Sequence, residues 1–142
     1  MTGGLAWPTA DLRLAFCMTD QACTEPTNED AVTVGGITAG SGTIDEFDGS
    51  GYSGAVALTG EAVTPDTTNN RGESFADDLG PTVYGNGTRQ LAGVLLVIWQ
   101  GTIDNSVPIA WIDTVSGTTF PFNPGGGTVE INWDAEGILQ TV

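Results

Sequence analysis

The sequence contains no lysine and no histidine, and its only three positive side chains, all arginine, stand against 18 acidic residues. Without histidine the chain cannot build a Ser-His-Asp or Cys-His catalytic arrangement, and without lysine it can form neither a Schiff base nor a phosphate-binding P-loop. A nucleic-acid-binding surface or a polybasic membrane anchor needs clustered Lys and Arg. The composition therefore predicts neither nucleic acid nor membrane as a partner.

Cysteine and long apolar segments are also scarce. Cys17 and Cys23 lie close enough in sequence for a disulfide, but two thiols without histidine supply at most half of a zinc site. The N-terminus lacks the basic segment of a signal peptide, and the longest apolar run, 91–99, is far shorter than the ~20 residues that cross a bilayer. We therefore expect a soluble, unexported protein, in which such cysteines are more often reduced than bonded.

Short strand-like segments separated by Gly, Asn, Asp, Pro and Ser dominate the chain. Apolar and polar side chains alternate in 12–18, 108–115 and 128–133, while 91–99 is continuously apolar, as in a strand buried on both faces. No segment has a convincing helical period. With a turn signal about every ten residues, the pattern predicts an all-β fold, a compact antiparallel sandwich or barrel (jelly-roll-like) with long glycine-rich loops.

Length and composition predict one domain over 1–142, with 1–10 as an extended N-terminal arm. Within it, 52–58 and 61–64 predict a strand or a hairpin, and the polar segment 65–73 predicts a loop.

Tryptophan supplies some of the largest apolar side chains of the sequence. Trp99, Trp111 and Trp133 lie in strand-like segments and are expected to help build the core. Trp7 precedes the first strand and stands beside Pro8, which leaves two interpretations open. The pair is either an exposed aromatic-proline arm that docks on a neighbouring subunit, or Trp7 simply packs across the end of the domain.

Asp45, Glu46 and Asp48 precede a glycine-rich turn, where carboxylate oxygens can bind a hard cation such as calcium. The spacing is not that of an EF-hand, and a solvated acidic turn is the commoner alternative. Two carboxylates can also catalyse glycoside hydrolysis, but among 18 acids some pair always exists. The sequence therefore predicts no catalytic residue and no cofactor, with calcium at this turn as the alternative.

Several motifs follow one another in an order that resembles a known family. The apolar run 91–99 is followed by 105–113 (NSVPIAWID) and then by 124–138 (PGGGTVEINWDAEGI). In the first half, 45–52 (DEFDGSGY) and 70–78 (NRGESFADD) match more loosely. This order resembles a family of small structural proteins encoded by tailed bacteriophages.

The resemblance implies a virion component, assembled in the host cytoplasm, and our hypothesis is a capsid decoration (cement) protein. Such a protein binds the major capsid protein on the outer surface of the assembled head and stabilises the shell by mass action. Trp7 and Pro8 are then the candidate capsid contacts, and symmetric sites favour a homo-oligomer such as a trimer. The alternative is a tail- or fibre-associated module that binds host glycan. We do not expect an enzyme.

Overall fold

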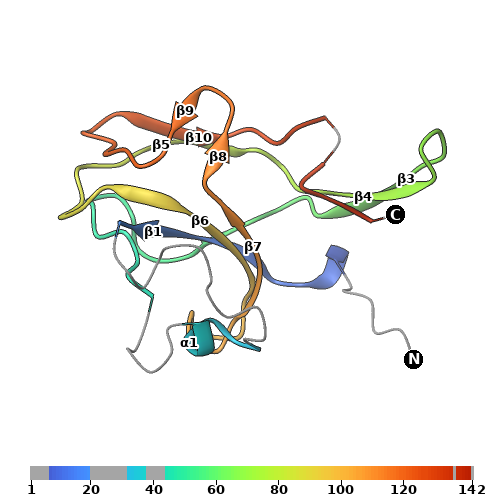
Figure 1. Cartoon of the computed structure of the whole chain (residues 1–142), viewed down its shortest axis with the longest axis horizontal. Coiled ribbons are helices and arrows are strands. Elements are labelled where there is room, and N and C mark those ends of the chain that lie inside the picture. The colour runs from blue at the N-terminus through green and yellow to red at the C-terminus, as the bar shows by residue number, and fades with distance from the viewer. Residues whose placement is uncertain (1–6, 20–31, 38–43, 136, 142) are drawn as a thin grey trace. The chain divides into compact units, whose positions relative to one another are not determined.

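The computed structural model describes residues 7–19, 32–37, 44–135 and 137–141 (Figure 1). Within these ranges almost all regular structure is extended, so the predicted all-β fold is confirmed. No helix in them is long and apolar enough to cross a membrane. The elements are η1 (Trp7–Thr9), β1 (Leu12–Met18), α1 (Val34–Ile37), β2 (Val56–Ala57), β3 (Ala62–Asp66), β4 (Arg71–Phe75), β5 (Leu79–Val83), β6 (Leu91–Ile98), β7 (Val107–Ile112), β8 (Thr114–Val115), β9 (Thr118–Thr119), β10 (Thr128–Ile131) and β11 (Leu139–Thr141).

The strands form four separate sheets (Figure 1). The largest has the order β2-β1-β6-β7, and a second has the order β11-β4-β3. Two further sheets have two strands each, β10-β5 and β8-β9. The sandwich or barrel arrangement stays a prediction.

The chain divides into two compact units whose segments alternate along the sequence, where the sequence predicted one domain. Residues 7–9, expected in an extended arm, form the short 3-10 helix η1 within the first unit. The first unit comprises Met1–Ala10, Leu58–Pro81 and Glu130–Val142, and the second comprises Asp11–Ala57 and Thr82–Val129.

The core of the second unit is built on β1 and β6. They pair antiparallel along their whole length, from Leu12 opposite Ile98 to Met18 opposite Leu91. Both strands are buried at nearly every position, as the continuous apolar run of β6 predicts. The alternation in β1 predicted one buried face, but Ala15 and Cys17 on the second face are buried too, and Arg13 is the one residue of the strand that is only partly buried. One cluster of this core, here called the core cluster, comprises Ala15, Cys17, Val34, Ile44, Leu95 and Val97.

The first unit contains the sheet β11-β4-β3, in which the register aligns Ala62 with Phe75 and Asp66 with Arg71. Of the strand or hairpin predicted for 52–58 and 61–64, the hairpin is therefore wrong, because β2 pairs with β1 while β3 pairs with β4. The loop predicted over 65–73 is largely strand, with a turn at 67–70 only.

The tight turn between β3 and β4 has a local cause. Oδ1 of Asp66 accepts hydrogen bonds from the backbone N–H groups of Thr68 (2.9 Å) and Asn69 (3.2 Å). Asn70 adopts a left-handed conformation with φ of 53°. Asp and Asn favour such turns for these reasons. The turn-forming residues in 65–73 therefore indicate the tight turn of a hairpin, not a long loop.

Candidate functional site

The acidic turn around Asp45, Glu46 and Asp48 forms hydrogen bonds with the part of the β1 edge that β2 leaves unpaired. β2 pairs with only two residues of β1. Beyond them, the N–H of Phe16 donates to the hydroxyl oxygen of Tyr52 (3.1 Å), and the N–H of Phe47 donates to the carbonyl of Phe16 (2.7 Å). The N–H of Met18 then donates to the carbonyl of Asp45 (2.9 Å). The segment therefore takes the place of a strand along this part of β1.

Two carboxylates of this turn have different partners. Oε1 of Glu46 accepts a hydrogen bond of 2.7 Å from the hydroxyl of Tyr52. Asp45 forms an ion pair with the guanidinium of Arg89. Both acids are half-buried, so these contacts replace hydrogen bonds that water would otherwise make to the carboxylates.

The third carboxylate, Asp48, is held by one residue of a neighbouring loop. Its two oxygens accept from the N–H (2.8 Å) and the hydroxyl (2.6 Å) of Thr88. These hydrogen bonds, the hydroxyl's first, lower the pKa of Asp48 below its ordinary value. Among the residues that the structure describes, no three His, Cys, Asp or Glu side chains form a metal-binding group. Calcium at this turn stays a prediction.

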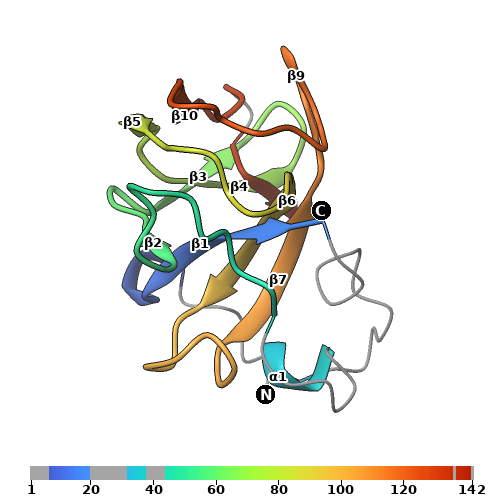
Figure 2. The same ribbon diagram turned by 90° about the vertical axis from the view of Figure 1, so that its left-hand side faces the viewer.

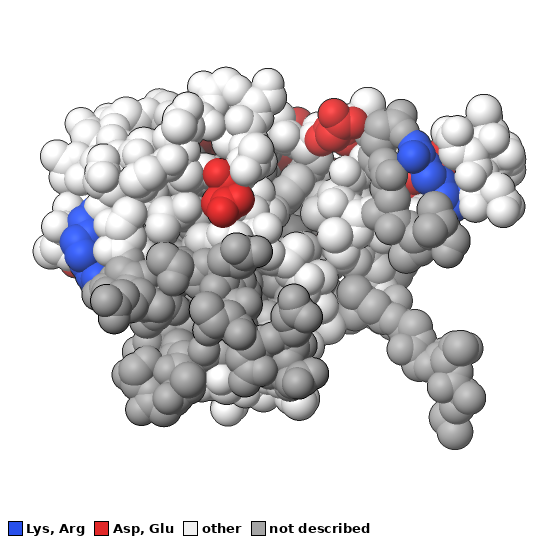
Figure 3. Space-filling model, viewed as in Figure 1, with Lys and Arg blue, Asp and Glu red and all other residues white. Residues whose placement is uncertain are grey.

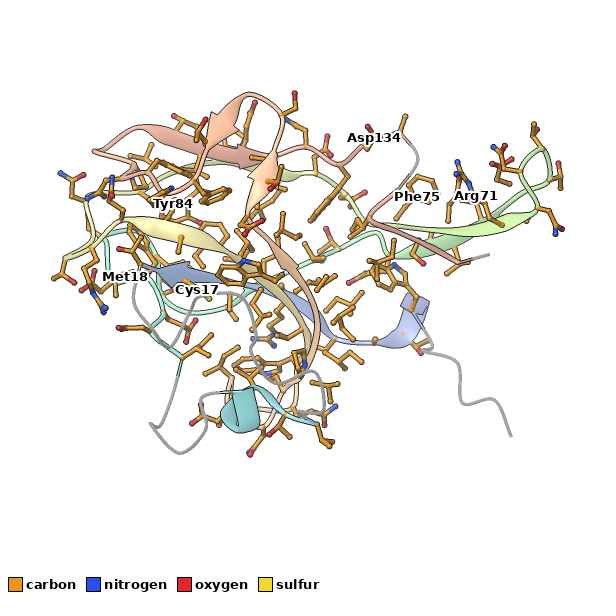
Figure 4. The ribbon with its side chains drawn as sticks, viewed as in Figure 1. Cys17, Met18, Arg71, Phe75, Tyr84 and Asp134 are labelled. Carbon is orange, nitrogen blue, oxygen red and sulfur yellow. The ribbon has the colours of Figure 1, made fainter. Side chains whose placement is uncertain are left out.

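Four aromatic rings pack beneath the turn. Phe16 stacks on Tyr52, with ring centroids 5.3 Å apart, and meets Tyr84 edge-on at 5.5 Å. Phe47 meets both tyrosines edge-on. Tyr84, labelled in Figure 4, comes from the segment after β5, a strand that the sequence did not predict. Burial, and after it the charge of Glu46, raises the pKa of Tyr52 far above its ordinary value. The cluster is part of the packed interior.

Every arginine of the chain is paired with a carboxylate. On the face drawn in Figure 3, red atoms can be seen next to blue ones. Each arginine thus has its charge compensated locally. The pairs are Arg13–Asp11 (2.9 Å), Arg71–Asp66 (3.2 Å), Arg71–Glu73 (3.0 Å) and Arg89–Asp45.

Trp7, the candidate docking residue, is buried within the first unit. Its exposed fraction is 2%, and its indole N–H donates a hydrogen bond of 2.8 Å to the carbonyl of Phe75 in β4. The packing interpretation therefore describes Trp7, and the exposed-arm interpretation does not. The side chain of Pro8 lies outside the described residues.

The other three tryptophans, which were expected to help build the core, are only partly buried. Trp111 packs against the core cluster, as expected. Trp99 instead lies under the guanidinium of Arg13, 4.3 Å from the ring centroid. Trp133 follows β10 and donates its indole N–H to the carbonyl of Asp77 (3.0 Å). A place in a strand-like segment did not predict how deeply these tryptophans are buried, because Trp99 and Trp133 lie just past the ends of β6 and β10.

Cys17 lies in the interior of β1, where its thiol is within 3.5 Å of the carbonyl oxygen of Ala15 (Figure 4). Such a position suits a small core residue. Cys23 lies outside the described residues, so the bonding of the two cysteines stays open.

A short hairpin in the second unit offers a different kind of surface. Residues 114–119, here called the hairpin surface, form β8 and β9 and the turn between them; all six are exposed and none is charged. Gly117 forms the turn with a φ of 87°, and Val115 is 41% exposed. The two strands form a sheet of their own, and β9 projects beyond β7 in Figure 2. Unpaired strand edges of this kind can pair with another chain.

The hairpin surface was not predicted from the sequence. The alternation over 108–115 predicted one strand, whereas β7 ends at Ile112 and β8 begins at Thr114. The Ser116-Gly117 dipeptide between Val115 and Thr118 is the signal that could have revealed the hairpin.

No family model, no curated protein and no solved structure matches this chain.

Proposed function

We propose that this chain is a structural protein of a tailed-bacteriophage virion, without enzymatic activity, that binds the outer surface of the assembled capsid and stabilises it. The observation that carries the proposal is the hairpin surface, an exposed and uncharged pair of strands on a protein with a net charge of -15. The order of motifs over 91–138, which resembles that of phage structural proteins, supports the same role. The major capsid protein is the proposed partner.

The hairpin surface suits binding to another protein for a physical reason. Its backbone N–H and C=O groups on the outer edges can add to a strand of a partner, and its Thr and Val side chains favour extended pairing. Because it carries no charge, docking there buries no unpaired carboxylate. A hairpin alone is small, so a specific interface of ~800 Å² per partner would include residues around it.

The charge distribution supports the outer rather than the inner capsid surface. A protein inside the head would face packaged DNA with a net charge of -15 and with each of its arginines already paired. Repulsion from phosphate opposes that location. On the outside the same charge keeps the free protein soluble before it binds.

The first test is the number of copies in purified particles of the phage that encodes the chain. Symmetric capsid sites predict copies on the order of hundreds per head, measured by quantitative mass spectrometry. A handful of copies would contradict capsid decoration. Immunogold labelling of the tail together with binding on a glycan array would support the host-glycan alternative instead.

The second test measures binding of the purified chain to particles that lack it. Val115→Asp places a charge in the hairpin surface and should weaken binding at least ~10-fold, since a buried unpaired charge is costly. Val63→Asp is the matched control, because Val63 is 49% exposed, is also in a strand and lies in the other unit. Equal binding by the two variants would place the contact elsewhere.

A further inference from the structure

One dipeptide in the second unit is chemically reactive. Asn86-Gly87 is the only Asn-Gly pair in the sequence, and Asn86 is exposed. An asparagine followed by glycine is prone to cyclise, because glycine has no side chain to hinder attack by its own backbone nitrogen. The pair therefore marks a position where the chain can change covalently without an enzyme.

Packing explains why the glycine of this pair is retained. A Cβ atom at position 87 would lie 2.5 Å from Cε2 of Phe47, 2.9 Å from the carbonyl oxygen of Arg89 and 2.9 Å from Oδ1 of Asp48. Contacts of this length are not tolerated, so any other residue would displace the aromatic cluster or the acidic turn. The fold requires Gly87, and the reactive pair follows from that requirement.

The nitrogen that would attack is engaged by a neighbouring side chain. The N–H of Gly87 donates a hydrogen bond of 3.1 Å to Oδ1 of Asn123. Asn123 precedes Pro124, whose nitrogen carries no hydrogen, so Asn123 cannot cyclise in the same way. Asn123, which cannot undergo this reaction, therefore accepts a hydrogen bond from the nitrogen that would attack Asn86.

We propose that Asn86 is the site of spontaneous deamidation in this protein and that Asn123 restrains the reaction. Hydroxide removes the Gly87 amide proton, and the nitrogen attacks Cγ of Asn86. The new C–N bond closes a succinimide, while the bond from Cγ to Nδ2 breaks and ammonia leaves with a proton from water. Hydrolysis by one water then opens the ring to aspartate or isoaspartate. The hydrogen bond to Asn123 opposes both the loss of the proton and the rotation that attack requires.

The product differs from the native chain in charge and in shape. Aspartate adds one negative charge beside Gly125, since Oδ1 of Asn86 lies 3.6 Å from where a Cβ atom at that glycine would be. Isoaspartate also lengthens the backbone. The change is irreversible, so the modified fraction records the age of the molecule and how often this loop has opened.

The test is peptide mapping by mass spectrometry during incubation of the folded chain at mildly alkaline pH. Asn86 should be the first asparagine modified, and Asn123→Ala should raise its rate severalfold. Asn123→Asp retains an oxygen acceptor at the same position and should keep the rate near that of the native chain. Faster modification at another asparagine, or an unchanged rate in Asn123→Ala, would overturn the proposal.

Two further measurements guard against a variant that does not fold. In the native chain, the Gly87 amide should exchange with deuterium more slowly than in the chain unfolded in urea, and Asn86 should deamidate severalfold faster in urea. Equal rates in the folded and unfolded chains would refute restraint by the fold. Asn86→Gln should remove the signal from this peptide, which identifies the reacting residue.

Discussion

The hydroxyl of Tyr52 donates a hydrogen bond of 2.7 Å to Oε1 of Glu46 and accepts one of 3.1 Å from the N–H of Phe16. The Tyr52 phenol thus accepts a hydrogen bond that the backbone of a neighbouring strand would otherwise accept, because β2 pairs with only two residues of β1. The acidic turn that invited a metal-site interpretation has a structural task in the described chain, which is to satisfy backbone and side-chain groups that the sheet leaves unpaired.

Replacing this phenol should destabilise the fold. Tyr52→Phe leaves the Phe16 N–H and the Glu46 carboxylate without their partner, which should lower the free energy of unfolding by about 2 kcal/mol. Glu46→Gln retains an oxygen acceptor and should cost less, about 1 kcal/mol. Urea denaturation followed by circular dichroism measures both. Equal stability of Tyr52→Phe and the native chain would contradict the assigned role.

The same residue should make the protein sensitive to alkali. Burial, followed by the charge of Glu46, raises the pKa of Tyr52 above its ordinary value of 10.0, so the folded state favours the neutral phenol. That contribution is complete below the ordinary pKa and is lost as the pH rises above it, because the unfolded chain ionises first. Above pH ~10, stability should therefore fall more steeply in the native chain than in Tyr52→Phe. Parallel curves of unfolding free energy against pH would argue against this effect.

Asp48 should make the protein less stable at acidic pH, whereas Tyr52 does so at alkaline pH. The hydroxyl of Thr88 and then its N–H lower the pKa of Asp48, so its contribution is present above the ordinary carboxyl pKa and is lost as the pH falls. Thr88→Val removes the hydroxyl and retains the N–H, which should raise the pKa of Asp48 part of the way toward its ordinary value. Carboxyl NMR titration measures the change.

An internal control for that titration is Asp66. Its pKa is lowered first by the side chain of Asn69, in the other unit of the chain. Thr88→Val should leave it unchanged. If Asp66 shifts as much as Asp48, or if Asp48 does not shift, the hydroxyl of Thr88 is not the cause.

The sequence predicted the elements whose signals are local. The apolar run of β6 and the alternation in β1, β7 and β10 identify strands because burial and pleat act on neighbouring residues. Pairing is not local. Residues 52–58 and 61–64 predicted a strand or a hairpin, but β2 and β3 belong to different sheets, and only their partners β1 and β4 determine that.

The candidate site was predicted as a group of residues but not as an arrangement. Asp45, Glu46 and Asp48 do adjoin one turn, yet each meets a partner 6 to 44 positions away in the chain. No local pattern shows that Thr88 and Arg89 return to this turn. Trp7 illustrates the same limit, because its acceptor belongs to β4, 68 positions further on.

Trp7 itself distinguishes packing from docking. Trp7→Ala removes a large buried side chain and should lower the free energy of unfolding by about 4 kcal/mol, and Trp7→Phe, which loses chiefly the hydrogen bond to Phe75, by about 1–2 kcal/mol. Trp99→Phe is the control, since Trp99 is only partly buried, and should cost less than Trp7→Ala. Weaker binding to particles with unchanged stability in Trp7→Phe would instead support a docking role.

Two glycines with similar φ angles should lose different amounts of stability when replaced by alanine. Gly60 has a φ of 68° and Gly101 a φ of 84°, so each pays about 1 kcal/mol for a left-handed alanine. A Cβ at Gly60 would also lie 2.4 Å from Oδ1 of Asp77, whereas nothing lies within 4 Å of one at Gly101. Asp77 cannot move away freely, because its N–H donates to the carbonyl of Thr59 (2.8 Å) and its Oδ2 accepts from the hydroxyl of that residue (3.1 Å). Gly60→Ala should therefore cost about 1–2 kcal/mol more than Gly101→Ala in urea denaturation, and equal losses would show that Asp77 yields without cost.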